Sequence, residues 1–288
     1  MMGRWVILMS ILYLLWFVVG LTGSGLSVQW LAWANGIYLI LGGATALVWY
    51  VRKYGARQAV LMFIICSSIS YAAEWLGTRH AGFHTGADSD PSRFAPLLFG
   101  VPLAVPFAWC MLLIIAKAFA PVEPAQDILK GLTPLEKLSP GLRQLKLERK
   151  RRKRRSFWLP ALWTASMAAS MNLLLQPSGV QSQPRPWNGG WLSVWSTPDD
   201  QTTLIFFICW WFTALLIISI INYLHDEYID QARSAAFSPL FVPVMLLLTL
   251  ESLFLTLAVQ SGLWWSVLLN VSMLALLFLL RRKKASIV

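Results

Sequence analysis

The sequence predicts an all-α fold, that of a polytopic integral membrane protein with about eight transmembrane helices. Hydrophobic residues make up 57% of the 288-residue chain and charged residues only 13%, whereas a soluble domain carries roughly 25% charged residues. The apolar residues also form segments of about 18–25 residues, the length that crosses a hydrocarbon core of about 30 Å. We place these segments at residues 4–21, 28–51, 57–77, 96–118, 157–176, 202–224, 236–260 and 263–280.

The basic residues predict that both termini face the cytoplasm. If the N-terminus is inside, most of the positive charge falls on the inner side, including the stretches 52–57 and 281–284. The outer side then receives only Arg79, Arg93 and Arg185. Because an excess of Lys and Arg marks the cytoplasmic side, we expect a multi-pass protein of the cell (cytoplasmic) membrane, N-in and C-in.

The predicted helices form two groups. Residues 1–120 hold the first four helices with an outer loop at 78–95, residues 121–156 form a basic cytoplasmic loop, and residues 157–288 hold the second four. Nine of the thirteen residues from Arg143 to Arg155 are basic. We expect the 143–155 run to attract anionic lipid headgroups, at about 1 kcal/mol per basic residue near the surface. No aromatic residues interleave these charges, so nucleic acid is not expected as a partner.

Single features of the segments refine this prediction. The first segment begins with a charge, but its apolar run is long and no cleavage site follows it, so we interpret it as a span and not as a signal peptide. The segment 157–176 is the most polar of the eight. Cys66, Cys110 and Cys209 lie within predicted spans without a CxxC pair, which is typical of small buried hydrophobic residues.

Glu74 is the most informative residue, because ionisable side chains in membrane segments are usually paired or functional. Ser67, Ser70, Tyr71 and Glu74 recur at spacings of three to four residues and therefore form one polar stripe on the third helix. Such a stripe faces protein or a hydrated cavity. The alternative is a structural Glu74 that only bonds to a neighbouring helix.

Glu251 in the seventh segment is a second carboxylate in the outer half of the membrane, beside a strip formed by Thr249, Ser252 and Thr256. The two carboxylates can share a pocket, where burial favours the protonated form. A protonated carboxyl group in a dry pocket is a competent general acid.

The outer loops carry further candidates. His80, His84, Asp88 and Asp90 are residue types that bind Zn or Fe, but the glycines among them indicate a loop, and we expect solvated side chains and no metal. The second outer loop, 177–201, contains Trp191 among other tryptophans, which either anchor the chain at the interface or line an entrance for an apolar ligand.

The start of the fourth segment is rich in Gly and Pro. Pro102 and Pro106 each remove an amide donor, so we expect a kinked helix and a notch beside Glu74. The chain has no Walker loop, no G-x-S-x-G and no HExxH motif.

The segment from Glu74 to Trp109 resembles the carotenoid biosynthesis membrane proteins, a family that includes hydratases of bisanhydrobacterioruberin and related ψ-end carotenoids. The resemblance covers about an eighth of the chain closely and departs from the family pattern in the loop AGFHTGADSD and near the sixth segment, where an Asp and an Asn are missing. The matching residues are Glu74, Gly77, Gly100, Val101, Pro102, Leu103, Pro106, Ala108 and Trp109.

The resemblance implies an enzyme that adds water to a terminal double bond by acid catalysis, without a redox cofactor. Glu74 would be the acid, with Glu251 or Asp88 as a second acid or water-orienting group, and Trp109 and Trp191 would stabilise the cation. The partners would be a carotenoid or another isoprenoid lipid and other carotenoid enzymes in a complex. The expected substrate-binding residues are Tyr71, Gly77, His80, His84, Gly100, Pro102, Trp109 and Trp191.

Two other classes of function remain open at this point. A proton-coupled transporter or an isoprenoid-binding membrane protein would use Glu74 and Glu251 for proton coupling or ligand contact. A structural assembly factor would leave both carboxylates replaceable.

Overall fold

The computed structural model describes most of the predicted helices. The described residues are 2–25, 34–80, 96–99, 101–120, 158–171, 201–224, 240–260, 268 and 271–272. Within this part of the chain the structure is helical apart from one short hairpin, so the prediction of an all-helical fold is confirmed. The eighth predicted segment, 263–280, lies almost entirely outside the described residues.

Most helices coincide with predicted apolar segments. The fifth segment appears as a helix at 158–171. The other helices are α1 (Met2–Gly25), α2 (Ala34–Tyr54), α3 (Ala56–His80), α4 (Val105–Phe119), α7 (Gln201–Leu224) and α9 (Phe241–Gln260).

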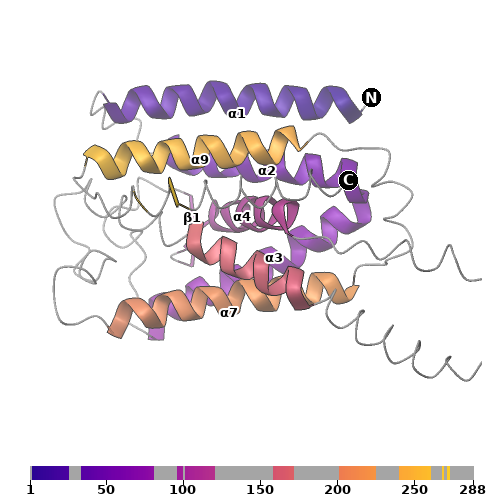
Figure 1. The fold of residues 1–288 in the computed structure, drawn as a ribbon, viewed down its shortest axis with the longest axis vertical. Coiled ribbons are helices and arrows are strands. Elements are labelled where there is room, and N and C mark those ends of the chain that lie inside the picture. Colours follow the sequence, from indigo (N-terminus) through magenta and orange to yellow (C-terminus); the bar gives the residue numbers. More distant parts are fainter. Residues whose placement is uncertain are drawn as a thin grey trace, which may run out of the picture.

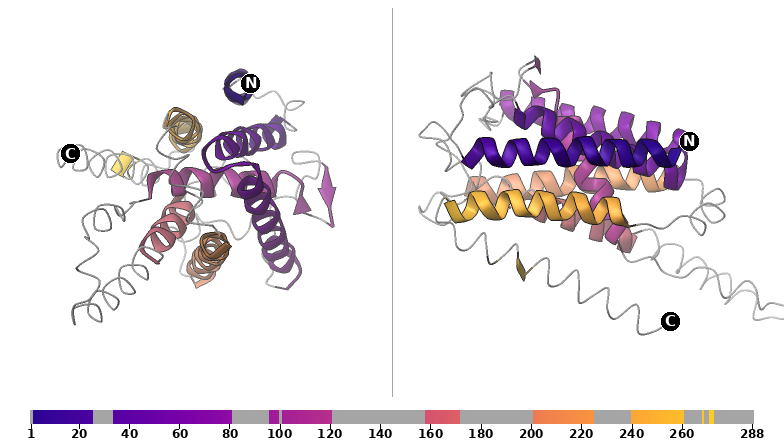
Figure 2. Two further views of the ribbon diagram at one scale, coloured as in Figure 1. Left: turned by 90° about the vertical axis from the view of Figure 1, so that its right-hand side faces the viewer. Right: turned by 90° about the horizontal axis from the view of Figure 1, so that it is seen from above.

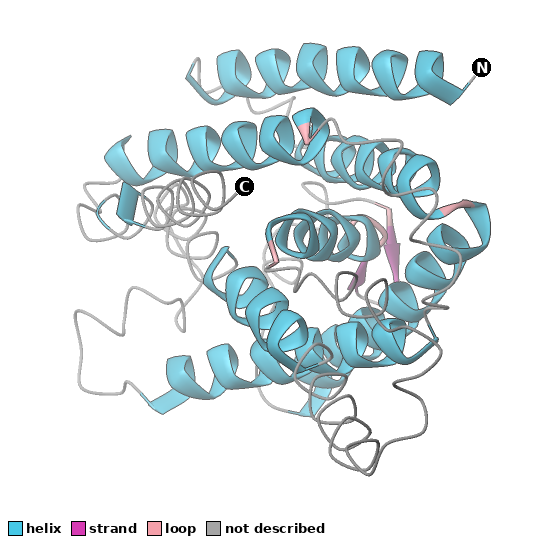
Figure 3. Ribbon diagram, turned by 45° about the vertical axis from the view of Figure 1, so that its right-hand side comes forward, coloured by secondary structure: helices cyan, strands magenta, loops and turns pink. Residues whose placement is uncertain are grey.

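The fourth segment was predicted to be one kinked helix over residues 96–118. In the structure it is a hairpin followed by a helix. Its first residues form an antiparallel hairpin of β1 (Leu97–Leu98) and β2 (Val101–Pro102), coloured magenta in Figure 3. Phe99, in the turn, has a positive φ of 50°. The helix begins only at Val105, with Pro106 in its first turn, where a missing N–H costs no helical hydrogen bond. Pro102 therefore lies in a hairpin and Pro106 at the start of a helix, and neither kinks one.

Helix α4 lies in the middle of a bundle (Figure 1). Figure 2 shows α1, α7 and α9 end-on, with α4 crossing between them at an angle. Helices α2, α3 and α9 pack against α4, and α1 lies at the periphery against α2 and α9. Helices from both predicted groups therefore belong to one packed bundle.

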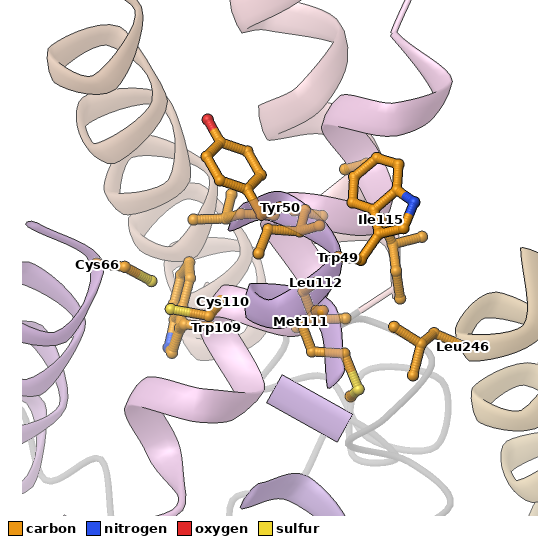
Figure 4. Packing of buried hydrophobic residues seen from close by; sticks show 14 of the residues in the cluster. Trp49, Tyr50, Cys66, Trp109, Cys110, Met111, Leu112, Ile115 and Leu246 are labelled. Atoms are coloured by element: carbon orange, nitrogen blue, oxygen red, sulfur yellow. The ribbon is translucent and has the colours of Figure 1, made fainter. Parts of the chain in front are cut away.

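The centre of the bundle is apolar because α4 is buried along most of its length. Cys110, Leu113, Ile115 and Ala116 have no exposed surface at all, and Figure 4 shows this cluster with its neighbours on α2 and α3. A Cβ atom built on Gly43 of α2 would lie 2.4 Å from the carbonyl oxygen of Phe107. Glycine thus permits the close crossing of α2 and α4, as small residues do in membrane helix pairs.

A buried hydroxyl cluster holds α1 on the bundle. The Tyr13 hydroxyl lies 2.6 Å from the Tyr38 hydroxyl on α2 and 2.6 Å from Thr249 Oγ1 on α9. Thr249 in turn donates to the Met245 carbonyl at 2.9 Å. The three hydroxyl groups therefore have hydrogen-bond partners among apolar helices, where a buried polar group without a hydrogen bond costs free energy.

Large apolar side chains are exposed on the outside of the bundle. On α1 they include Ile7, Leu15 and Val18, each more than half exposed, and such extended apolar surface is unusual for a soluble monomer. Within the described residues, one helical stretch, Ala56–Leu76, is long and apolar enough by itself to cross a membrane. Shorter apolar stretches with described side chains lie within α1, α4, α7 and α9. They are Arg4–Val19, Val105–Phe119, Ile208–Leu224 and Phe241–Leu253.

The crossing of α2 and α4 predicts that Gly43→Ala destabilises the protein. The added methyl group meets the backbone of Phe107, and overpacking of this kind costs about 1–3 kcal/mol. Gly42→Ala is the matched control, because its nearest neighbour is the Met111 sulfur at 2.5 Å, and a flexible Met side chain can move. Thermal unfolding in detergent should give a lower Tm for Gly43→Ala than for Gly42→Ala; equal values would contradict this packing.

Candidate active site

Glu74 lies in the penultimate turn of α3, half-buried against the start of α4. The indole N–H of Trp109 on α4 faces the Glu74 carboxyl group. The pair does not reach the distance and angle of a normal hydrogen bond, since Trp109 Nε1 has no partner among the described residues. The structure therefore brings together the predicted acid and one of the two predicted cation-stabilising tryptophans.

Trp109 belongs to an aromatic stack. Its ring lies against Trp210 of α7, with centroids 4.6 Å apart and planes 18° from parallel. Trp210 was not predicted as a site residue, although the consecutive Trp210 and Trp211 in an apolar segment were a signal. A carboxyl group next to stacked indole rings can deliver a proton to an apolar ligand, and the π faces attract the positive charge that results.

Tyr71 connects the stripe on α3 to the hairpin that precedes α4. Its hydroxyl donates to the carbonyl of Leu98 and lies 3.5 Å from the carbonyl of Val101. Val101 and Pro102 are both buried in β2. Tyr71 therefore has a positioning role, because it holds the hairpin one turn from Glu74.

The remaining residues of the stripe also face the interior. Ser70 has no exposed surface and Ser67 is half-buried. Neither hydroxyl has a hydrogen-bond partner among the described residues. One turn before Ser70, the Cys66 thiol faces the Cys110 thiol of α4 (Figure 4). The prediction of buried cysteines holds for this pair, whereas Cys209 is exposed on α7.

Glu251 is buried on α9, with 4% of its surface exposed. Its Oε2 atom has no hydrogen-bond partner within the described part of the chain. Helix α9 packs on α4, α2 and α1, whereas α3 packs on α4, α2 and α7, and the two helices lie on different sides of α4 (Figure 2). A pocket shared by Glu74 and Glu251 stays a prediction.

Several other predicted site residues are not described in full. Gly77 and His80 lie in the last turn of α3, but the His80 side chain is not described. Four lie outside the described residues, namely His84, Asp88, Gly100 and Trp191. Among the side chains that are described, no three His, Cys, Asp or Glu residues gather around a possible metal position.

Comparison with known families shows which family the chain belongs to. The family model described as "Carotenoid biosynthesis protein" matches residues 34–277, which includes every described helix except α1. No curated protein and no solved structure matches the chain.

The contact of Tyr71 with the hairpin predicts that Tyr71→Phe loosens residues 96–103. Loss of a hydrogen bond worth about 1 kcal/mol should speed amide exchange there by about fivefold. Tyr223→Phe is the control, because that ring is 82% exposed. Hydrogen exchange followed by mass spectrometry checks this, and equal exchange in the two variants would remove the positioning role of Tyr71.

Proposed function

Because the chain belongs to the family of carotenoid biosynthesis proteins, we propose that it is a hydratase that adds water to a terminal double bond of a ψ-end carotenoid. The family supports a role in carotenoid biosynthesis and an isoprenoid substrate. The observation that carries the finer proposal is the juxtaposition of the Glu74 carboxyl group with the Trp109–Trp210 stack.

The proposed reaction is a proton addition followed by capture of water. Protonated Glu74 gives its proton to the less substituted carbon of the double bond, the π electrons form the new C–H bond, and a tertiary cation remains on the other carbon. A water oxygen then forms the C–O bond, and the surplus proton of that water returns to the Glu74 carboxylate. The sum is one water added, with no net oxidation, so the step itself needs no redox cofactor.

The position of the site suits a substrate that is apolar along its length. Glu74 lies near the outer end of α3, according to the predicted orientation, so a polyene can remain among apolar side chains while its end reaches the acid. The Trp109 and Trp210 rings support the developing cation through their π faces. Glu251 and Asp88 are the two candidates for a second acid or water-orienting group.

The second candidate function is a proton-coupled transporter or isoprenoid-binding protein. The observation that favours it is Glu251, a buried carboxyl group on α9 that lies on another side of α4 from Glu74. Carboxylates at two positions along a bundle are typical of proton pathways. Analysis of the carotenoids formed distinguishes this function from the hydratase, because a transporter or binding protein would form no hydrated carotenoid.

Glu74→Gln is expected to remove the hydrated product, because the amide cannot donate the proton. In a lycopene-producing bacterial host, liquid chromatography and mass spectrometry should show a carotenoid heavier by one water for the wild-type chain. Loss of a general acid typically costs about 10²–10⁴-fold in rate, so the variant should fall at least about a hundredfold.

The control for this variant is Ser68→Ala, on the exposed side of α3. It should retain the product at an equal level of protein in the membrane. A normal product level in Glu74→Gln would end the assignment of the acid. An unchanged pigment profile with the wild-type chain would favour the transporter or binding function.

The proposed N-in, C-in, multi-pass topology predicts which loops are accessible from outside. A cysteine placed at Ser89, in the 78–95 loop, should react with an impermeant maleimide in intact cells. A cysteine at Ser139, in the 121–156 loop, should react only after the cells are opened. The parent chain corrects for its own three cysteines, and labelling of both loops from one side would refute the topology.

A further inference from the structure

We infer that Ser70 holds the water molecule that attacks the cation, in a position between α3 and α4 that it shares with Glu74 and Trp109. This inference rests on the proposed function for its chemistry, but the water position itself follows from the packing. It makes Ser70 a positioning residue of the hydration step.

The direction of the Ser70 side chain follows from its neighbours one turn away on either side. Cys66, four residues before, meets Cys110 of α4, and Glu74, four residues after, meets Trp109 of α4. Residues at i and i+4 lie on one face of a helix. Ser70 therefore faces α4 between these two contacts, and its complete burial agrees with this placement.

The Ser70 hydroxyl does not use the partner that its own helix offers. Serine and threonine in helices commonly donate to the carbonyl four residues before. Within the described part of the chain, hydroxyls that do so at 2.7–2.9 Å include Thr45, Thr164, Ser170, Thr213 and Thr249. Ser70 Oγ makes no such bond, so its hydroxyl is directed to the helix interface.

Two polar groups without a partner thus border the same interface as Glu74. Trp109 Nε1 is a donor and Ser70 Oγ is a donor and an acceptor, and both are buried without a partner among the described residues. A buried water typically makes about three hydrogen bonds to such groups. The indole, the hydroxyl and the carboxyl group supply three, which places the water beside the acid that receives its proton.

In this reaction Glu74 is needed to form the cation, whereas Ser70 affects only whether water captures it. Without an ordered water, the cation loses a proton from an adjacent carbon to the Glu74 carboxylate, and a double bond re-forms. In deuterated water this return path leaves carbon-bound deuterium in carotenoid that is not hydrated. Ser70→Ala should therefore shift the outcome from hydration to deuterium exchange, whereas Glu74→Gln should stop both.

The first experiment incubates membranes that contain lycopene and each variant in deuterated water. We expect Ser70→Ala to lower the ratio of hydrated product to deuterated lycopene by about fivefold, as for one lost hydrogen bond. Ser70→Thr keeps the hydroxyl and should restore the ratio. Ser219→Ala is the matched control, because Ser219 Oγ also has no partner among the residues that the structure describes but lies on α7, outside the stripe. A wild-type ratio in Ser70→Ala would overturn the inference.

The second experiment does not depend on activity. Radiolytic footprinting of the purified protein in ¹⁸O-labelled water marks side chains next to bound water. We expect the label at Trp109 in the wild-type chain and several-fold less in Ser70→Ala, with no change in Ser219→Ala. No label at Trp109 would refute the water position even if the chain is a hydratase. Label at Trp109 without any hydrated or deuterated carotenoid would refute the proposed function and leave the water position standing.

Discussion

The close crossing of α2 and α4 is the constraint on which the rest of the bundle depends. Gly43 lets the α2 backbone reach the backbone of Phe107, so α4 lies in the middle of the bundle and contacts helices on several sides. A central helix must present apolar side chains in every direction, and α4 does so from Trp109 to Ala116. The hairpin that precedes this helix and Trp109 near its start therefore lie against the C-terminal end of α3.

The candidate active site is a product of that placement. Trp109 is fixed by burial and by its stack on Trp210, and Tyr71 fixes the hairpin from the other helix. The carboxyl group of Glu74 thus lies against rigid neighbours contributed by different helices. Precise positioning of reacting groups is a large part of catalysis, and here it comes from packing and not from a network of charges.

The sequence predicted much of the fold and part of the site. Long apolar runs predicted helices that the structure contains, and the spacing of Ser67, Ser70, Tyr71 and Glu74 predicted the buried stripe, because helical periodicity is a local property. The hairpin at Leu97–Pro102 was not predicted, since two-residue strands leave no periodic pattern. Trp210 was also missed: its contact with Trp109 joins residues about a hundred positions apart, and no local pattern encodes such a contact.

The hydroxyl cluster around Tyr13 has a consequence for how the chain is assembled. Tyr13 bonds to Tyr38, 25 residues later, and to Thr249, 236 residues later. During synthesis α1 and α2 can therefore form their pair early, while the second bond of Tyr13 waits for almost the whole remaining chain. Until α9 arrives, the Tyr13 hydroxyl has only one of its final partners in an apolar surrounding. Helix α1 is thus held first by the hydrogen bond of Tyr13 to Tyr38, and by the bond to Thr249 as well only when the bundle is complete.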